Sequence, residues 1–188
     1  PAPSPTPAPA PGITSFVSYP NATSLGSVSS SWGGIPAGFE VQNGALQVVS
    51  GLGGYGEYAY DASQTGSDQG VEVVRKGGTF PGGLAINLMM NGSASHYGVT
   101  FSANSADFRR EGVAYGSSYS IPHSINWAQD ATLKLTKVGN VIKVFGNGVE
   151  LYSYTDASPL TGGSPGFSMT PGNDVTLLRL TSFNSSPN

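Results

Sequence analysis

The stretch LKLTKVGNVIKVFGNGVELYSYTDASPLTGGSPGFSM, residues 133–169, decides the fold of this chain. Apolar and polar residues alternate on both sides of two turns, Gly139-Asn140 and Gly146-Asn147-Gly148. Glycine and asparagine accept the positive φ angles that tight hairpins need. The pattern predicts a three-stranded antiparallel meander, followed by a glycine-rich bend into a further strand.

Short apolar runs separated by turn residues continue on both sides of this stretch. They predict strands near residues 39–42, 45–50, 57–60, 70–75, 84–90, 97–102, 117–121, 132–138, 141–145, 149–154, 166–170 and 175–183. Turn signals recur roughly every 8–12 residues, which is typical of a sandwich of two sheets. No window shows a sustained helical period. We therefore expect an all-β protein, a two-sheet antiparallel β-sandwich.

The stretch 133–169 resembles the laminin-G/concanavalin-A-like lectin (jelly-roll) superfamily. In that fold the same succession of strands and Gly-Asn turns leads through a Gly-rich bend into a core strand. The stretch is particularly similar to lectin-like domains of secreted or cell-surface bacterial proteins and sugar-processing enzymes. The resemblance implies two sheets, with ligands held by loops at one end or on a concave face. It leaves the function open, because the superfamily includes lectins, adhesion domains, glycoside hydrolases and lyases.

The composition excludes several classes of protein. The chain has 188 residues, enough for one sizeable core, and only 10% of them are charged. A net charge of -3 provides no basic surface for phosphates, so we expect no nucleic-acid partner. No apolar run approaches the length of a membrane span, so we expect no membrane insertion. Because there is no cysteine, disulfides and thiolate chemistry are excluded.

The first twelve residues, PAPSPTPAPAPG, have a different composition from the rest. We expect 1–12 to be an extended Pro/Ala-rich tail or linker and 13–188 a single β-sandwich domain. The tail resembles O-glycosylated extracellular stalks, which implies modification at Pro3, Ser4, Pro5, Thr6, Pro7 and Pro9. Sequons at expected loops or termini predict N-glycosylation at Asn21, Asn91 and Asn184. These features favour an extracellular or cell-surface glycoprotein.

No convincing catalytic group is present in the sequence. A glycosidase needs two carboxylates across one sugar bond, and the nearest pair is Glu57 and Asp61. In a regular strand their backbones lie about 13 Å apart, so we expect two solvent-facing acids and no enzyme. No cofactor is expected, and the metal content stays open. The resemblance allows a structural Ca²⁺, with five loop acids as candidate ligands: Asp61, Asp68, Asp130, Asp156 and Asp174.

Exposed aromatic rings are the residues that would stack on sugars. Tyr58 and Tyr60 alternate with the small Ala59 and are expected to share one strand face. The candidate carbohydrate platform comprises Tyr55, Tyr58, Tyr60, Tyr115, Tyr119 and Trp127.

Two function hypotheses follow, with a glycoside hydrolase or lyase as a third. The main one is a non-catalytic structural or adhesive subunit of a surface fibre or matrix. Its extended N-terminal segment, including Ile13, Phe16, Val17 and Tyr19, would engage the sheet of a neighbouring copy, head to tail. The alternative is a lectin-like carbohydrate-binding module that binds polysaccharide and is tethered by its Pro-rich linker to a secreted enzyme.

Overall fold

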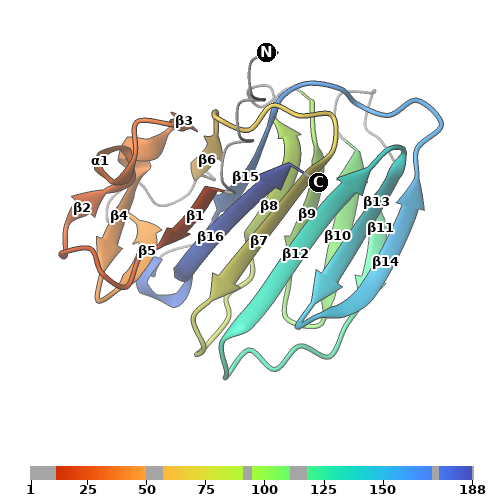
Figure 1. Cartoon of the computed structure of the whole chain (residues 1–188). Coiled ribbons are helices and arrows are strands. Elements are labelled where there is room, and N and C mark those ends of the chain that lie inside the picture. Colours follow the sequence, from red (N-terminus) through yellow and green to blue (C-terminus); the bar gives the residue numbers. More distant parts are fainter. Residues whose placement is uncertain (1–11, 50–56, 91–94, 111–117, 171–173, 188) are drawn as a thin grey trace, which may run out of the picture.

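A computed structural model describes residues 12–49, 57–90, 95–110, 118–170 and 174–187 of the chain. Two antiparallel sheets pack face to face, with the nine-stranded sheet in front in Figure 1 and the seven-stranded sheet behind it. The predicted all-β sandwich is therefore confirmed. Within the described part of the chain, no helix has the length and apolar character needed to cross a membrane.

The strands have the following bounds. In spatial order, the nine-stranded sheet contains β14 (Val149–Thr155), β13 (Val141–Gly146), β12 (Ala131–Val138), β7 (Gln69–Arg75), β16 (Leu180–Pro187), β5 (Ala45–Val48), β4 (Phe39–Gln42) and β2 (Thr23–Ser24), with β1 (Gly12–Ser15) also paired to β16. The seven-stranded sheet contains β11 (Tyr119–Pro122), β10 (Ser105–Arg110), β9 (Tyr97–Phe101), β8 (Leu84–Met90), β15 (Ser164–Met169), β6 (Glu57–Asp61) and β3 (Trp32–Gly34). Among the described residues, three single turns of helix lie between strands: α1 (Leu25–Val28), η1 (Pro36–Gly38) and η2 (Val175–Leu177).

The meander predicted from residues 133–169 is present as β12, β13 and β14. Gly139 has φ +58° in the first turn, and Asn147 and Gly148 have φ +50° and +79° in the second. These left-handed angles are why glycine and asparagine stand there. The glycine-rich bend leads into a further strand, β15, as predicted, and the structure shows that β15 belongs to the other sheet.

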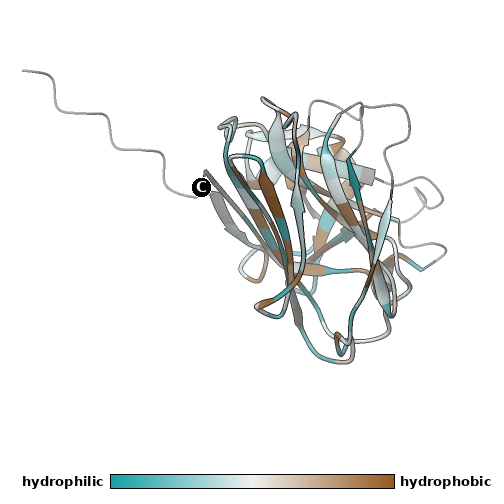
Figure 2. Cartoon of the chain, turned by 90° about the vertical axis from the view of Figure 1, so that its right-hand side faces the viewer, coloured by the Kyte–Doolittle hydropathy of each residue, from teal (hydrophilic) through white to brown (hydrophobic). Residues whose placement is uncertain are grey.

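The core lies between the two sheets, which Figure 2 shows side by side in an end-on view. Successive side chains of a strand point to opposite faces, so the burial pattern of β12 alternates along the strand. Trp32 makes edge-on contacts with Phe167 and Phe183, with ring centroids 5.9 and 4.9 Å apart. Phe39 contacts the same Phe167 at 5.1 Å. These rings come from both sheets and fix how the sheets lie on each other.

A buried arginine holds one end of the sandwich together. Arg75 is 1% exposed, and its guanidinium donates to the carbonyls of Gly78, Trp127, Thr79 and Leu177 at 3.1, 2.6, 2.5 and 3.2 Å. The same group lies over the stacked rings of Phe80 and Trp127. One cation therefore joins three connecting segments of the chain.

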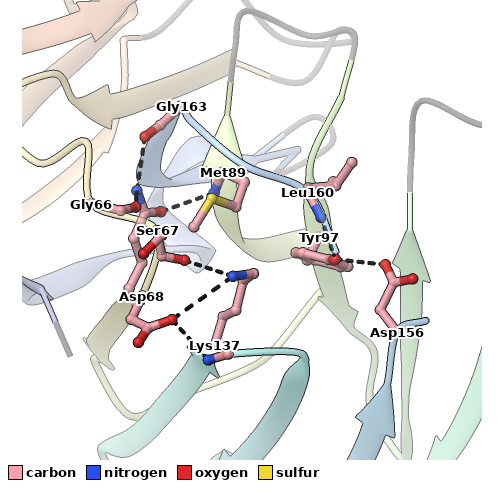
Figure 3. Close-up of polar contacts among 11 residues, drawn as sticks. Gly66, Ser67, Asp68, Met89, Tyr97, Lys137, Asp156, Leu160 and Gly163 are labelled. Carbon is pink, nitrogen blue, oxygen red and sulfur yellow. Dashed lines mark hydrogen bonds and ion pairs between the residues drawn. The ribbon is translucent and has the colours of Figure 1, made fainter. Parts of the chain in front are cut away.

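Polar contacts at the opposite end tie further loops to the sheets (Figure 3). The buried amide of Gln69 donates to the Gly163 carbonyl at 2.8 Å and accepts from the Met89 N–H at 3.0 Å. Lys137, 2% exposed, donates to the Ser67 carbonyl at 2.6 Å. Such pairing is required because an unpaired buried polar group costs about 1–3 kcal/mol.

The third contact in Figure 3 joins Tyr97 to the loop after β14. Its hydroxyl donates to Asp156 at 2.6 Å and accepts from the Leu160 N–H at 2.9 Å. Burial, followed by the hydrogen bond to Asp156, raises the pKa of Tyr97 to about 12. Arg110 forms an ion pair with the same carboxylate.

The N-terminal segment is used within the chain. Strand β1 pairs with β16, and Phe16, which follows β1, is 0% exposed in the core. Tyr19 is half-buried, whereas Val17 is 67% exposed. We expected these residues to be available to a neighbouring copy. Within the described chain, β1 instead pairs with β16, and the Phe16 side chain that follows it packs in the chain's own core.

Candidate functional site

Two tyrosines of β6 lie on the outer face of the seven-stranded sheet. Ala59 between them is 0% exposed and points into the core, so Tyr58 and Tyr60 share the opposite face of the strand. Both are half-buried. Within the described chain, neither hydroxyl has a hydrogen-bond partner. The two side chains therefore present ring surface and free hydroxyls outward.

Glycines of the neighbouring strands make room for these rings. A Cβ atom at Gly33 of β3 would lie 2.4 Å from Cε2 of Tyr60, and one at Gly34 would lie 3.0 Å from Cδ2 of Tyr58. On the other side, a Cβ at Gly166 of β15 would lie 2.8 Å from the Tyr60 Cβ. The rings thus lean over β3, where any larger residue would displace them.

Cross-strand register extends this surface over the whole sheet. Directly paired residues of antiparallel strands share a face, so each row can be followed from strand to strand. The first row runs Gly33, Tyr60, Gly166, Asn87, Gly98 and Arg109. The second runs Tyr58, Ser168, Ala85, Thr100, Asp107 and Ser120. We call this surface the tyrosine face.

The tyrosine face is aromatic at one end and polar at the other. Asn87 forms its floor at 3% exposure, with Oδ1 close to Gly98. Ser168, Thr100 and Asp107 are partly exposed, and Arg109 is exposed. Such a surface can pack rings against flat apolar groups and exchange hydrogen bonds with hydroxyls beside them.

The other predicted platform residues do not lie on this face. Trp127 is 9% exposed, stacks on Phe80 with centroids 3.9 Å apart, and donates from Nε1 to the Ala103 carbonyl at 2.8 Å. Its prediction as a platform residue is wrong, because the indole is held in the core. Tyr55 and Tyr115 lie outside the described residues.

Tyr119 belongs to a separate aromatic cluster at the open edge of the sandwich. It is 42% exposed and pairs with Phe108, whose side chain is in the core, so it faces between the sheets. Its ring stacks on Tyr152 of the opposite sheet at 5.8 Å and lies 6.0 Å from Tyr154. Burial, followed by the charges of neighbouring phenols, raises the pKa of Tyr152. Tyr119 and Tyr58 therefore cannot contact one flat ligand together.

Asp61 was expected to face solvent, and this expectation is wrong. It is 5% exposed: Oδ1 accepts from the Ser63 N–H and hydroxyl at 3.0 and 2.6 Å, and Oδ2 accepts from the Ser185 hydroxyl at 2.6 Å. The Glu57 side chain lies outside the described part of the structure. Asp61 is thus a bridging carboxylate between the sheets.

The acids considered as calcium ligands all accept hydrogen bonds from backbone N–H groups. Besides Asp61, Asp68 accepts from Gly139, Asp130 from Gly77, Asp156 from Ser158 and Asp174 from Thr176. They lie apart, and no three histidines or acids gather as a metal site within the described residues. Calcium prefers six to eight oxygen ligands, so these acids do not fit such an ion.

The glycosylation candidates have different surroundings. Asn21 is exposed, and its Oδ1 accepts from the Asn43 N–H at 2.7 Å. Asn184 was expected at a loop or terminus, but it lies within β16 between β1 and β7. A glycan there would need space on a paired sheet. Asn91 and the tail positions Pro3, Ser4, Pro5, Thr6, Pro7 and Pro9 lie outside the described residues.

Comparison with known proteins shows the fold. No family model matches the chain, and no curated protein matches it. A carbohydrate-binding module, CBM66 from Bacillus subtilis, is 16% identical with a TM-score of 0.61, covering 81% of this chain and 91% of that one. The carbohydrate recognition domain of Emp46p in a potassium-bound form is 12% identical with a TM-score of 0.65, covering 93% and 95%. A native glycosidic hydrolase is 14% identical with a TM-score of 0.65, covering 97% and 98%.

These likenesses confirm the expected jelly-roll fold of two antiparallel sheets. At such low identity they carry the fold alone. The polar residues of the tyrosine face, Asn87, Thr100, Asp107, Arg109 and Ser168, were not predicted. The only signals for them are an asparagine inside the apolar run of β8 and a weak alternation along β10.

Proposed function

We propose that this chain is a carbohydrate-binding module whose tyrosine face holds a neutral glycan. The observation that carries the proposal is the pair Tyr58 and Tyr60, placed side by side on an outer sheet face by glycines of β3. The apolar faces of sugar rings pack on such side chains, and the free phenol hydroxyls can bond sugar hydroxyls.

The remaining groups of the tyrosine face support the same ligand class. Ser168 and Thr100 can donate to and accept from sugar hydroxyls. Asp107 and Arg109 contribute one negative and one positive charge on neighbouring rows. Because these charges offset each other, the face suits an uncharged polysaccharide better than a polyanion.

The comparisons support carbohydrate as the class of ligand. Two of the matched structures are described as a carbohydrate-binding module and a carbohydrate recognition domain. The fibre hypothesis receives less support, because β1 is paired within the chain. We therefore place polysaccharide binding ahead of head-to-tail assembly, and we expect the protein to act outside the cell or at its surface.

Affinity electrophoresis tests the proposal directly. The protein is run through gels containing a mixed-linkage β-glucan, a galactomannan, a xylan or an inulin-type fructan. Wild type should be retarded by at least one of them, and the Tyr58→Ala/Tyr60→Ala double variant should migrate freely. Tyr119→Ala is the matched control, because it removes a more exposed tyrosine away from this face. No retardation in any gel, or retardation retained by the double variant, would overturn the proposal.

The proposed function includes no catalysis at the tyrosine face. A glycosidase uses two carboxylates, and Asp107 is the single carboxylate in the two rows described. Incubation with the retarding polysaccharide should release no reducing ends. Release that stops in Asp107→Asn would assign the face to a hydrolase instead.

A further inference from the structure

A cleft separate from the tyrosine face lies between the edges of the two sheets, on the inner side of β3 and β6. It is a cleft of about 510 Å³, within the range of small-molecule sites. Its lining residues belong to β1, α1, β3 and β6, which are labelled in Figure 1, and to the segments that directly follow β1, α1 and β6. Its wall is rich in aliphatic hydroxyls: Thr14, Ser15, Ser18, Ser29, Ser31 and Ser63.

A nearly buried carboxylate contributes to this cleft. Asp61 is 5% exposed and lines it. Two donors from Ser63 occupy the lone pairs of Oδ1, whereas Oδ2 accepts from Ser185 alone among the residues that the structure describes. Each carboxylate oxygen can accept two hydrogen bonds, so Oδ2 retains one acceptor position.

The surroundings of Asp61 select the charge of a ligand. Within the described residues, no lysine, arginine or histidine forms an ion pair with this carboxylate. An anionic ligand would therefore be repelled. A divalent cation would need several oxygen ligands, and the Ser63 donors already occupy Oδ1. A neutral ligand hydroxyl can donate a hydrogen bond to the remaining acceptor position of Oδ2 without adding charge.

Apolar surface completes the cleft. Tyr19 and Val28 are half-buried in its wall, and the indole of Trp32 lines it beside Asp61, its cross-strand partner. A sugar ring likewise combines apolar and polar surface, with C–H groups on its faces and hydroxyls around its rim. The serine hydroxyls can both donate to and accept from that rim.

From this geometry we infer that the cleft binds the end unit of a neutral polyhydroxylated ligand, a hexose or the end of a glycan chain. One ligand hydroxyl donates to Oδ2 of Asp61, and the ring packs near Trp32 and Tyr19. This site is independent of the tyrosine face. Tyr60 and Asp61 are consecutive in β6, so their side chains lie on opposite faces of the sheet.

Solution NMR of the whole chain tests the inference. D-glucose, D-galactose, D-mannose and D-fructose are titrated separately at millimolar concentration into ¹⁵N-labelled protein. At least one hexose should shift the amide signals of residues 28–31 and 61–63 in a saturable manner. Ser29→Phe, which fills the cleft from its wall, should weaken that binding about tenfold or more. Ser30→Phe is the matched control, because this neighbouring serine is exposed outside the cleft and should leave binding unchanged.

Two further titrations distinguish hexose binding in the cleft from glycan binding at the tyrosine face and from calcium binding. Tyr58→Ala/Tyr60→Ala should retain the hexose shifts even where polysaccharide retardation is lost. Calcium chloride alone should not shift residues 61–63. Saturable shifts with calcium, no hexose shifts in wild type, or equal binding in Ser29→Phe and wild type would each overturn the inference.

Discussion

The Tyr97 hydroxyl donates a hydrogen bond to Oδ2 of Asp156 at 2.6 Å, and this bond joins the two sheets. Tyr97 belongs to β9 of the seven-stranded sheet, and Asp156 follows β14 of the nine-stranded sheet. The same hydroxyl accepts from the Leu160 N–H at 2.9 Å. The phenol therefore holds the segment that leads from the meander to β15.

Replacing Tyr97 with phenylalanine keeps the ring and removes both hydrogen bonds. The Leu160 N–H loses its acceptor and Asp156 loses a donor, so the free energy of unfolding should fall by about 1–3 kcal/mol. Urea unfolding followed by tryptophan fluorescence measures this change. Tyr119→Phe is the control, because its hydroxyl has no partner within the described residues, and it should change stability by less than about 0.5 kcal/mol. Equal effects of the two variants would contradict the assignment.

Asp156 should make the protein sensitive to acid. Burial acts to raise the pKa of Asp156, but hydrogen bonds from Tyr97, the Ser158 N–H and Arg110 outweigh it and bring the pKa below 3.8. Because the folded pKa is depressed, its contribution to stability is present above the unfolded value and lost as pH falls through the folded pKa. The free energy of unfolding is measured with urea at pH 7 and in steps below pH 4. It should fall less with decreasing pH in Asp156→Asn than in wild type. Parallel pH curves for the two proteins would contradict this.

Arg75 should contribute more to stability than any surface charge. Arg75 is 1% exposed, and its guanidinium donates hydrogen bonds to four carbonyls. Arg75→Met should therefore lower the free energy of unfolding by about 2–5 kcal/mol. Burial first, and then the charge of Arg179, lowers the pKa of Arg75. Arg179→Met removes that repulsion and should be neutral or slightly stabilising. Thermal unfolding compares the two variants. A destabilised Arg179→Met with an unaffected Arg75→Met would contradict the stabilising role of the buried Arg75 guanidinium.

Much of the fold follows from local pattern, and its exceptions have physical causes. The meander was predicted because its strands of period two are bounded by strong turn residues, and β8 because it is a short continuous apolar run. Strand β10 was missed, since only Ala106 and Phe108 among its six residues are apolar. Strand β3 was missed because two of its three residues are glycine, a poor strand former. Residues 175–183 were predicted as one strand, but η2 begins there and β16 runs on to Pro187.

The candidate site could be predicted only in part, because register is a long-range property. Alternation around Ala59 was enough to place Tyr58 and Tyr60 on one face. Nothing local indicates that Asn87 lies two strands from Tyr60. The burial of Asp61 likewise depends on Ser185, which is 124 residues away in the chain.

Gly33→Ala tests whether the orientation of Tyr60 serves binding and not only packing. The new Cβ would lie 2.4 Å from Cε2 and 2.5 Å from Cζ of Tyr60, which are at the mobile end of a side chain, so the ring should turn away. We expect polysaccharide retardation to fall severalfold while the free energy of unfolding changes by about 1 kcal/mol or less. Gly163→Ala is the contrasting variant, because its Cβ would lie 2.4 Å from the Met89 carbonyl oxygen at a positive φ of +81°. It should destabilise the fold by more than about 1 kcal/mol without a specific effect on the tyrosine face. Full retardation in a stable Gly33→Ala protein would show that the ring orientation is structural, and the glycan would then have to be held by other residues of this face.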